Sequence, residues 1–70
     1  MNNDIKYIIK ALRVGKGFKA GEFAKKVGIS REYLRLIENG KAKRISKEIM
    51  IKIASELNSD VITLFFSNEN

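Results

Sequence analysis

Positively charged side chains are the residues whose types and spacing could do chemistry in this chain, and they are unevenly distributed. Residues 1–44 contain twelve Lys and Arg against four Asp and Glu, which gives a net charge of +8. Residues 45–70 contain two against four, which gives −2. A one-sided basic surface suits a polyanion, because cations that bind phosphates release the counterions around them.

Residues for catalysis or metal binding are scarce. The chain has no Cys and no His, so thiolate nucleophiles, disulfides and the usual ligand sets of zinc, haem and iron–sulfur clusters are missing. Gly15-Lys16-Gly17 lacks the spacing of a nucleotide-binding loop, and no nucleophile–base pair is present. We therefore expect no enzyme activity, metal, cofactor or small-molecule ligand.

The apolar stretches are too short for a membrane span. The longest one, Val61 to Phe66, contains Thr63, and the N-terminus lacks the apolar segment of a signal peptide. The basic residues are spread over several predicted helices, which argues against one amphipathic helix on a membrane surface. We expect a cytoplasmic protein with no membrane partner.

Helical periodicity runs through the chain, and no segment alternates as a strand would. The predicted helices are Asp4–Val14, capped by Asn3 or Asp4; Ala20–Val27; Arg31–Glu38, capped by Ser30; a segment capped by Ser46 that reaches Leu57; and a last turn or two from Ser59-Asp60 to Phe66. Their expected inward faces include Ile5, Ile8, Ile9 and Leu12 in the first helix, and Ile49, Met50, Ile53, Ala54 and Leu57 in the fourth. We expect an all-α fold, a compact bundle of five short helices that forms one domain over residues 1–70.

Two of these helices have the spacing of a helix-turn-helix motif, over about residues 20–38. Ala24 is small where the two helices must cross closely, and Gly28 permits the sharp turn between them. The positions that would anchor both helices to the core are all apolar: Phe23, Val27, Ile29, Leu34 and Ile37.

The chain resembles the Cro/lambda-repressor-like (XRE) helix-turn-helix family through the motif Phe23-Ala24-x-x-Val27-Gly28-Ile29-Ser30-Arg31-x-x-Leu34-x-x-Ile37-Glu38-Asn39-Gly40. The resemblance extends to Ile5–Phe18, Ser46–Leu57 and Asp60–Phe65, so it covers nearly the whole chain. It implies a DNA-binding domain of the lambda-repressor type whose third helix enters the major groove.

The resemblance also implies that residues on the third helix read base edges: Arg31, Glu32, Tyr33, Arg35 and Leu36. Arg31 could bind guanine bidentately, Glu32 could accept from a cytosine amino group, and Leu36 could touch a thymine methyl. Without the motif, Arg31 and Glu32 would be interpreted as a solvated surface pair. For Tyr33 and Leu36, packing is an equal alternative to base contact.

Phosphate contacts are implied at the starts of both motif helices and in the loop after them: Lys19, Ala20, Ser30, Asn39, Lys41, Lys43 and Arg44. A merely solvated charge run is the alternative for the loop. Many relatives have a glutamine where Ala20 stands and use its amide to contact phosphate. Ala20 can offer only its backbone N–H, and Lys19 would partly replace the missing amide contact. Arg13 and Glu38 match positions that pair in relatives, so we expect a structural salt bridge between the first and third helices.

The expected function is that of a sequence-specific regulator of transcription that binds double-stranded DNA, either a repressor or a restriction-modification controller protein. Because one recognition helix reads few base pairs, we expect a homodimer on a palindromic operator. Ile62 and Phe66 offer apolar surface for the dimer interface, although Phe66 could instead cover the monomer's own core. The alternative is a protein-interaction module, such as the antitoxin of a toxin–antitoxin pair. A regulatory protein partner is compatible with either function.

Overall fold

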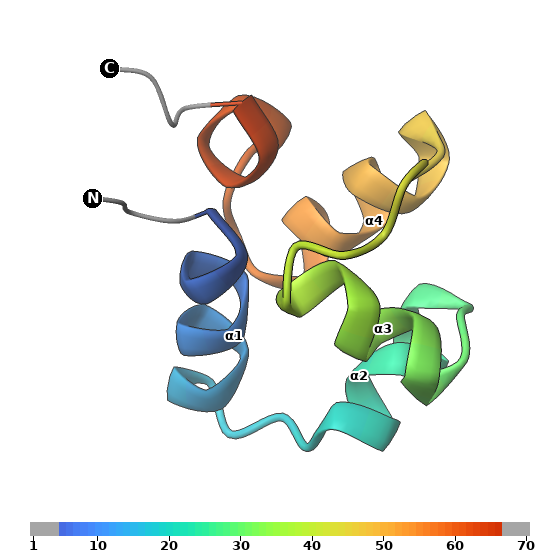
Figure 1. Cartoon of the computed structure of the whole chain (residues 1–70). Coiled ribbons are helices and arrows are strands. Elements are labelled where there is room, and N and C mark those ends of the chain that lie inside the picture. Colours follow the sequence, from blue (N-terminus) through green and yellow to red (C-terminus); the bar gives the residue numbers. More distant parts are fainter. Residues whose placement is uncertain (1–4, 67–70) are drawn as a thin grey trace.

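The computed structural model describes residues 5–66, and five helices account for most of that range. They are α1 (Ile5–Gly15), α2 (Ala20–Val27), α3 (Arg31–Glu38), α4 (Lys47–Glu56) and a short π-helix, η1 (Ile62–Phe66). No strand occurs among the described residues, and the predicted all-α fold is confirmed. In Figure 1, α1 stands on one side of the molecule, α2, α3 and α4 lie on the other, and η1 returns to pack against α1.

Serine side chains cap the starts of two helices. Ser30 Oγ accepts a hydrogen bond from the Tyr33 backbone N–H at 3.0 Å, and Ser46 Oγ accepts one from the Ile49 N–H at 3.1 Å. Each bond satisfies an N–H group that has no partner within its own helix. Both predicted caps are confirmed.

The first helix ends at Gly15, one residue beyond its predicted end. The Lys16 N–H still donates to the Leu12 carbonyl at 3.0 Å, so helical hydrogen bonding continues past Val14. The predicted caps of this helix, Asn3 and Asp4, lie outside the described residues.

The last predicted turn is a π-helix that follows Asp60. The Asp60 carboxylate accepts the Thr63 backbone N–H at 2.7 Å. This bond, together with one from the Thr63 side chain, stabilises the charged carboxylate and lowers the pKa of Asp60.

Apolar residues from every helix meet in one core: Ile9, Phe23, Ala24, Val27, Leu34, Ile37, Ile53, Ala54, Leu57 and Leu64. Leu12 and Ile49 are half-buried and pack against this core, and Met50 is half-buried. Ile8 departs from the predicted face, since it is 37% exposed while its neighbour Ile9 is 1% exposed. The reason is that α1 packs mainly against α3 and η1, which cover only part of its surface. The Ile5 side chain lies outside the described part.

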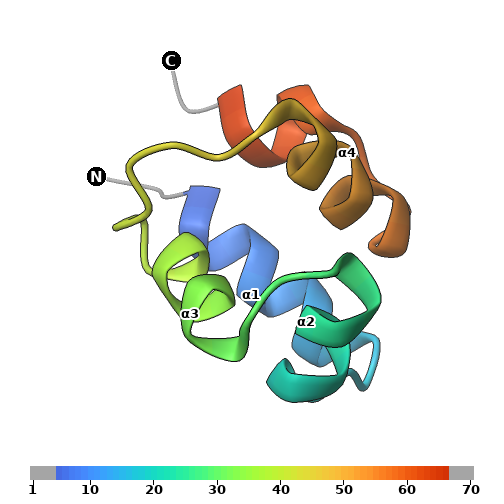
Figure 2. The same ribbon diagram turned by 90° about the vertical axis from the view of Figure 1, so that its right-hand side faces the viewer.

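The turn between α2 and α3 depends on a glycine, and Figure 2 shows the two helices that it joins. Gly28 has φ +92°, a left-handed conformation. Its N–H donates to the Ala24 carbonyl at 2.8 Å, and the Ile29 N–H donates to the same carbonyl at 2.9 Å. Ala24 is itself buried, as a residue at a close helix crossing should be.

Gly28→Ala should destabilise the fold by about 1–2 kcal/mol, because an L side chain is strained in the left-handed region. A Cβ at Gly28 would meet no atom within 4 Å, so this cost is conformational rather than steric. Gly21→Ala is the matched control: its Cβ also meets nothing within 4 Å, but Gly21 lies within α2. It should stabilise the fold by up to about 1 kcal/mol. Urea denaturation of the free protein measures both changes, and a Gly28→Ala variant as stable as the wild type would contradict the argument.

Candidate nucleic-acid interface

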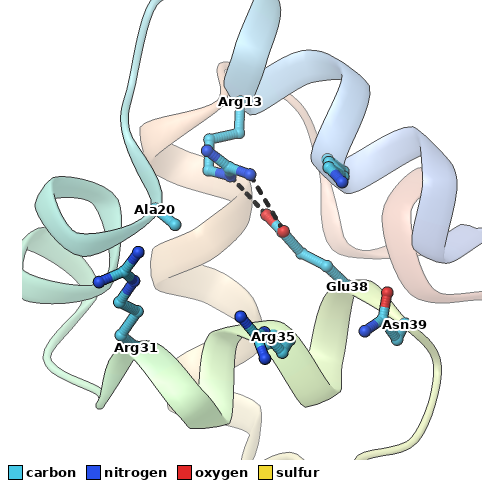
Figure 3. Close-up of a pocket in the computed structure, with 7 residues that line it drawn as sticks. Arg13, Ala20, Arg31, Arg35, Glu38 and Asn39 are labelled. Carbon is cyan, nitrogen blue, oxygen red and sulfur yellow. Dashed lines mark hydrogen bonds and ion pairs between the residues drawn. The ribbon is translucent and has the colours of Figure 1, made fainter.

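A buried ion pair joins α1 to the end of α3. Arg13 Nε donates to Glu38 Oε2 at 2.6 Å and Arg13 Nη2 donates to Glu38 Oε1 at 3.2 Å; the two residues are 6% and 5% exposed. Figure 3 shows the two contacts between Arg13 and Glu38 as dashed lines. Arg13 Nη1 also donates to the Phe18 carbonyl at 2.8 Å, in the connection that leads to α2. Because a buried charge is tolerated only when it is paired and hydrogen-bonded, this contact fixes α3 against α1.

Beside the ion pair, a pocket of about 210 Å³ opens between α1, the start of α2 and α3. Its lining residues are Lys10, Arg13, Ala20, Arg31, Arg35, Glu38 and Asn39. Arg13 neutralises the charge of Glu38. The pocket is therefore positive, because of the remaining cations Lys10, Arg31 and Arg35. Figure 3 shows the Arg31 side chain extending from α3 toward Ala20, the first residue of α2. The N–H groups at a helix start also favour anions, so the pocket is suited to a phosphate group.

A second hollow of about 210 Å³ lies on the outer face of α3 and is lined by Arg31, Glu32 and Arg35. These three residues are exposed, and Leu36 is 42% exposed on the same helix. Four of the five residues predicted to read bases therefore lie on the accessible surface of α3. Guanidinium donors beside a carboxylate acceptor have the chemistry to recognise base edges.

Tyr33, the fifth of these residues, is placed differently. It is half-buried and packs against the core. Its hydroxyl donates to the Arg44 backbone carbonyl at 2.6 Å. Its position in the structure thus matches the packing alternative.

The residues predicted to contact phosphate, apart from the three loop cations, are only partly brought together. Ala20 and Asn39 both line the pocket. Lys19 precedes α2, and its backbone N–H donates to Glu22 Oε1 at 3.3 Å. Ser30 is engaged as the cap of α3. Ala20 borders an open pocket, which a longer side chain at this position would fill in part.

The three cations of the loop between α3 and α4 do not line this pocket. Lys41, Lys43 and Arg44 are all exposed. They form a second group of positive charges, separate from the pocket.

Lys10 is a pocket residue that the sequence reasoning missed. It is exposed on α1 and lines the pocket together with Arg13, three residues further on. Residues at this spacing lie on one face of a helix. Because Arg13 was predicted to face the third helix, its spacing from Lys10 would have placed Lys10 on the same face of the first helix.

The two residues predicted for a dimer interface are exposed. Ile62 is 68% exposed and Phe66 is 58% exposed, whereas Leu64 between them is buried. Phe66 therefore leaves most of its surface outside the monomer's core.

No helix within residues 5–66 is long and apolar enough to cross a membrane. The same range contains no group of acidic side chains that could hold a metal ion. Its exposed site charges are mostly cations, which attract anions instead.

Comparisons with known proteins agree with this geometry. A helix-turn-helix family model matches residues 9–64. The SinR/SinI protein complex contains a similar chain, with 30% identity and a TM-score of 0.80 over 94% of this chain and 64% of that one. SinR, described as the master regulator for biofilm formation, has also been crystallised in complex with DNA. That SinR chain gives 33% identity and a TM-score of 0.76 over 87% of this chain and 97% of that one. A comparison with curated proteins gives no match.

The fold, the basic site and these similarities together define a DNA-binding domain of the helix-turn-helix class, similar to that of the regulator SinR. The chain belongs to the helix-turn-helix family, in its Cro/lambda-repressor-like (XRE) branch. It spans about two thirds of the SinR chain found with SinI and nearly all of the SinR chain found with DNA.

Glu38→Ala should lower the free energy of unfolding by about 3–5 kcal/mol, because it leaves the Arg13 guanidinium buried without its partner. The double variant Arg13→Met, Glu38→Leu should recover much of this loss, since it removes both buried charges. Urea denaturation of the free protein measures all three chains. If Glu38→Ala were as stable as the wild type, the ion pair would not be the contact that holds α3 against α1.

Proposed function

We propose that this chain is a sequence-specific regulator that binds a palindromic operator as a homodimer, with α3 of each copy in the major groove. The observation that carries the proposal is the exposure of Arg31, Glu32 and Arg35 together on α3, next to a positively charged pocket. In this proposal residues 1–70 act as one DNA-binding domain, and the regulator is a repressor or a restriction-modification controller protein. The similarity to a SinR chain solved with DNA supports DNA as the partner.

The site would divide its work between affinity and specificity. Phosphate contacts supply affinity for any duplex, whereas contacts to base edges distinguish sequences. We assign base reading to the exposed face of α3, with Arg31 and Glu32 in its first turn. We assign phosphate binding to the pocket and to the cations of the loop after α3.

Dimer formation would bring two copies of α3 about 34 Å apart, one turn of DNA. A single α3 contacts too few base pairs for adequate specificity. Ile62 and Phe66 are the most exposed large apolar residues of the described chain, which supports η1 as the dimer interface.

A protein partner is the second candidate for this apolar surface. SinR has been solved in a complex with the SinI protein, so a similar domain exists in a protein complex. An antitoxin bound to its toxin would need such a surface. The test of the dimer below also distinguishes this candidate.

Arg31→Ala should abolish the preference for the cognate operator and leave much of the non-specific binding, because it removes a bidentate base contact while Lys10 and Arg35 in the pocket and the loop cations remain to bind phosphate. Lys43→Ala, on the loop, is the matched control. It should weaken binding to all duplexes and reduce the slope of log K against log [salt] by roughly one. Titrations of operator and scrambled duplex at several salt concentrations separate the two effects. Equal weakening on both duplexes by Arg31→Ala would show that Arg31 does not read bases.

The double variant Ile62→Ser, Phe66→Ser should be monomeric at concentrations where the wild type is a dimer, because it removes the exposed apolar area of η1. Ile51→Ser is the matched control, since Ile51 is 51% exposed on α4. It should leave the dimer intact. Sedimentation equilibrium measures the mass of each protein. A double variant that remains dimeric would contradict this interface, and a monomeric wild type would favour a protein partner.

A further inference from the structure

The loop after α3, residues 39–46, is held by different contacts along its length; we call it the cationic loop because it carries Lys41, Lys43 and Arg44. Figure 2 shows it leaving α3 and running along the edge of the molecule to α4. Its first four backbone N–H groups donate to carbonyls of α3, with distances from 2.8 to 3.2 Å. Its last residue, Ser46, caps α4.

The middle of the cationic loop, residues 43–45, has one hydrogen bond among the described residues. It is the bond from the Tyr33 hydroxyl to the Arg44 carbonyl, at 2.6 Å. The half-buried Ile45 side chain adds packing against the core but no hydrogen bond. The Lys43 and Arg44 side chains therefore project from a backbone segment that is tied to α3 through Tyr33.

We infer that Tyr33 is a positioning residue: it fixes the cationic loop at a set distance from the residues of α3 that face DNA. This inference rests on the proposed function, in which α3 reads bases and the loop cations bind phosphate. The role differs from direct base reading, because the hydroxyl that could reach a base is engaged by the Arg44 carbonyl.

The surroundings of Tyr33 suit this role. Its backbone N–H is held by Ser30 Oγ at 3.0 Å, and its ring is half-buried against the core. The hydroxyl therefore projects from a fixed point, eleven residues before its acceptor in the sequence. Ordering the loop before binding reduces the conformational entropy that DNA binding must remove.

Tyr33→Phe tests the inference, because it removes the hydroxyl and keeps the ring. In the free variant, backbone ¹⁵N order parameters should fall at residues 43–45 and remain unchanged in α1–α4. DNA affinity should fall by about two- to tenfold, the range for one lost hydrogen bond. The loss should be equal on operator and scrambled duplex, and the salt slope should be unchanged because no cation is removed. Lys43→Ala is the contrast, since it lowers that slope.

Other outcomes would overturn the inference. Unchanged order parameters at residues 43–45 would show that the hydroxyl does not hold the loop. A loss of sequence preference without loosening of the loop would make Tyr33 a base reader. If the wild type bound no duplex, the proposed function would fail and Tyr33 would have no DNA contacts to position, while the order parameters would still report whether it holds the loop.

Discussion

The ion pair between Arg13 and Glu38 is the contact on which the rest of the interface depends. One guanidinium binds both carboxylate oxygens at the end of α3 and also the Phe18 carbonyl before α2, so it links three segments at one buried point. Each charge requires the other, because an unpaired buried charge costs on the order of several kcal/mol. The positions of the α3 side chains relative to α1 and the start of α2, and hence the shape of the pocket beside the pair, follow from this contact.

Apart from this ion pair the interior of the molecule is uncharged, whereas the proposed DNA-binding surface is cationic. The core is apolar apart from the ion pair, whereas the cations on α3 and in the cationic loop are exposed. In the proposed complex, affinity comes from charges that any duplex attracts, and specificity comes from a few side chains on one helix. Ala20 leaves an open pocket at the start of α2, so phosphate binding there would depend on cations from α1 and α3. Tyr33 would then hold the cations of the cationic loop at a fixed position relative to the cations of the pocket.

Most of the fold could be predicted from the sequence, because its signals are local. Ser30 and Ser46 cap helices, Gly28 permits the left-handed turn between α2 and α3, and the apolar periodicity locates the core. The features that could not be predicted depend on tertiary contacts. Ile8 has the spacing of a core residue, but the helices that pack against α1 do not cover it. The hydrogen bond from Tyr33 to the Arg44 carbonyl joins residues whose types give no sign of pairing, since any carbonyl can accept. The pocket brings Lys10 together with Arg31 and Arg35 from another helix, and only its spacing from Arg13 is visible in the sequence.

The most direct test of the central claim is selection of bound sequences from a pool of random duplex DNA by the purified full chain. The account predicts enrichment of a palindrome whose half-sites are about one helical turn apart, since two copies of α3 must enter successive major grooves on one side of the duplex. It also predicts that an Arg31→Ala protein selects no such sequence from the same pool. Enrichment of no sequence by the wild-type protein, even at low salt, would contradict the assignment of α3 as a reader of bases.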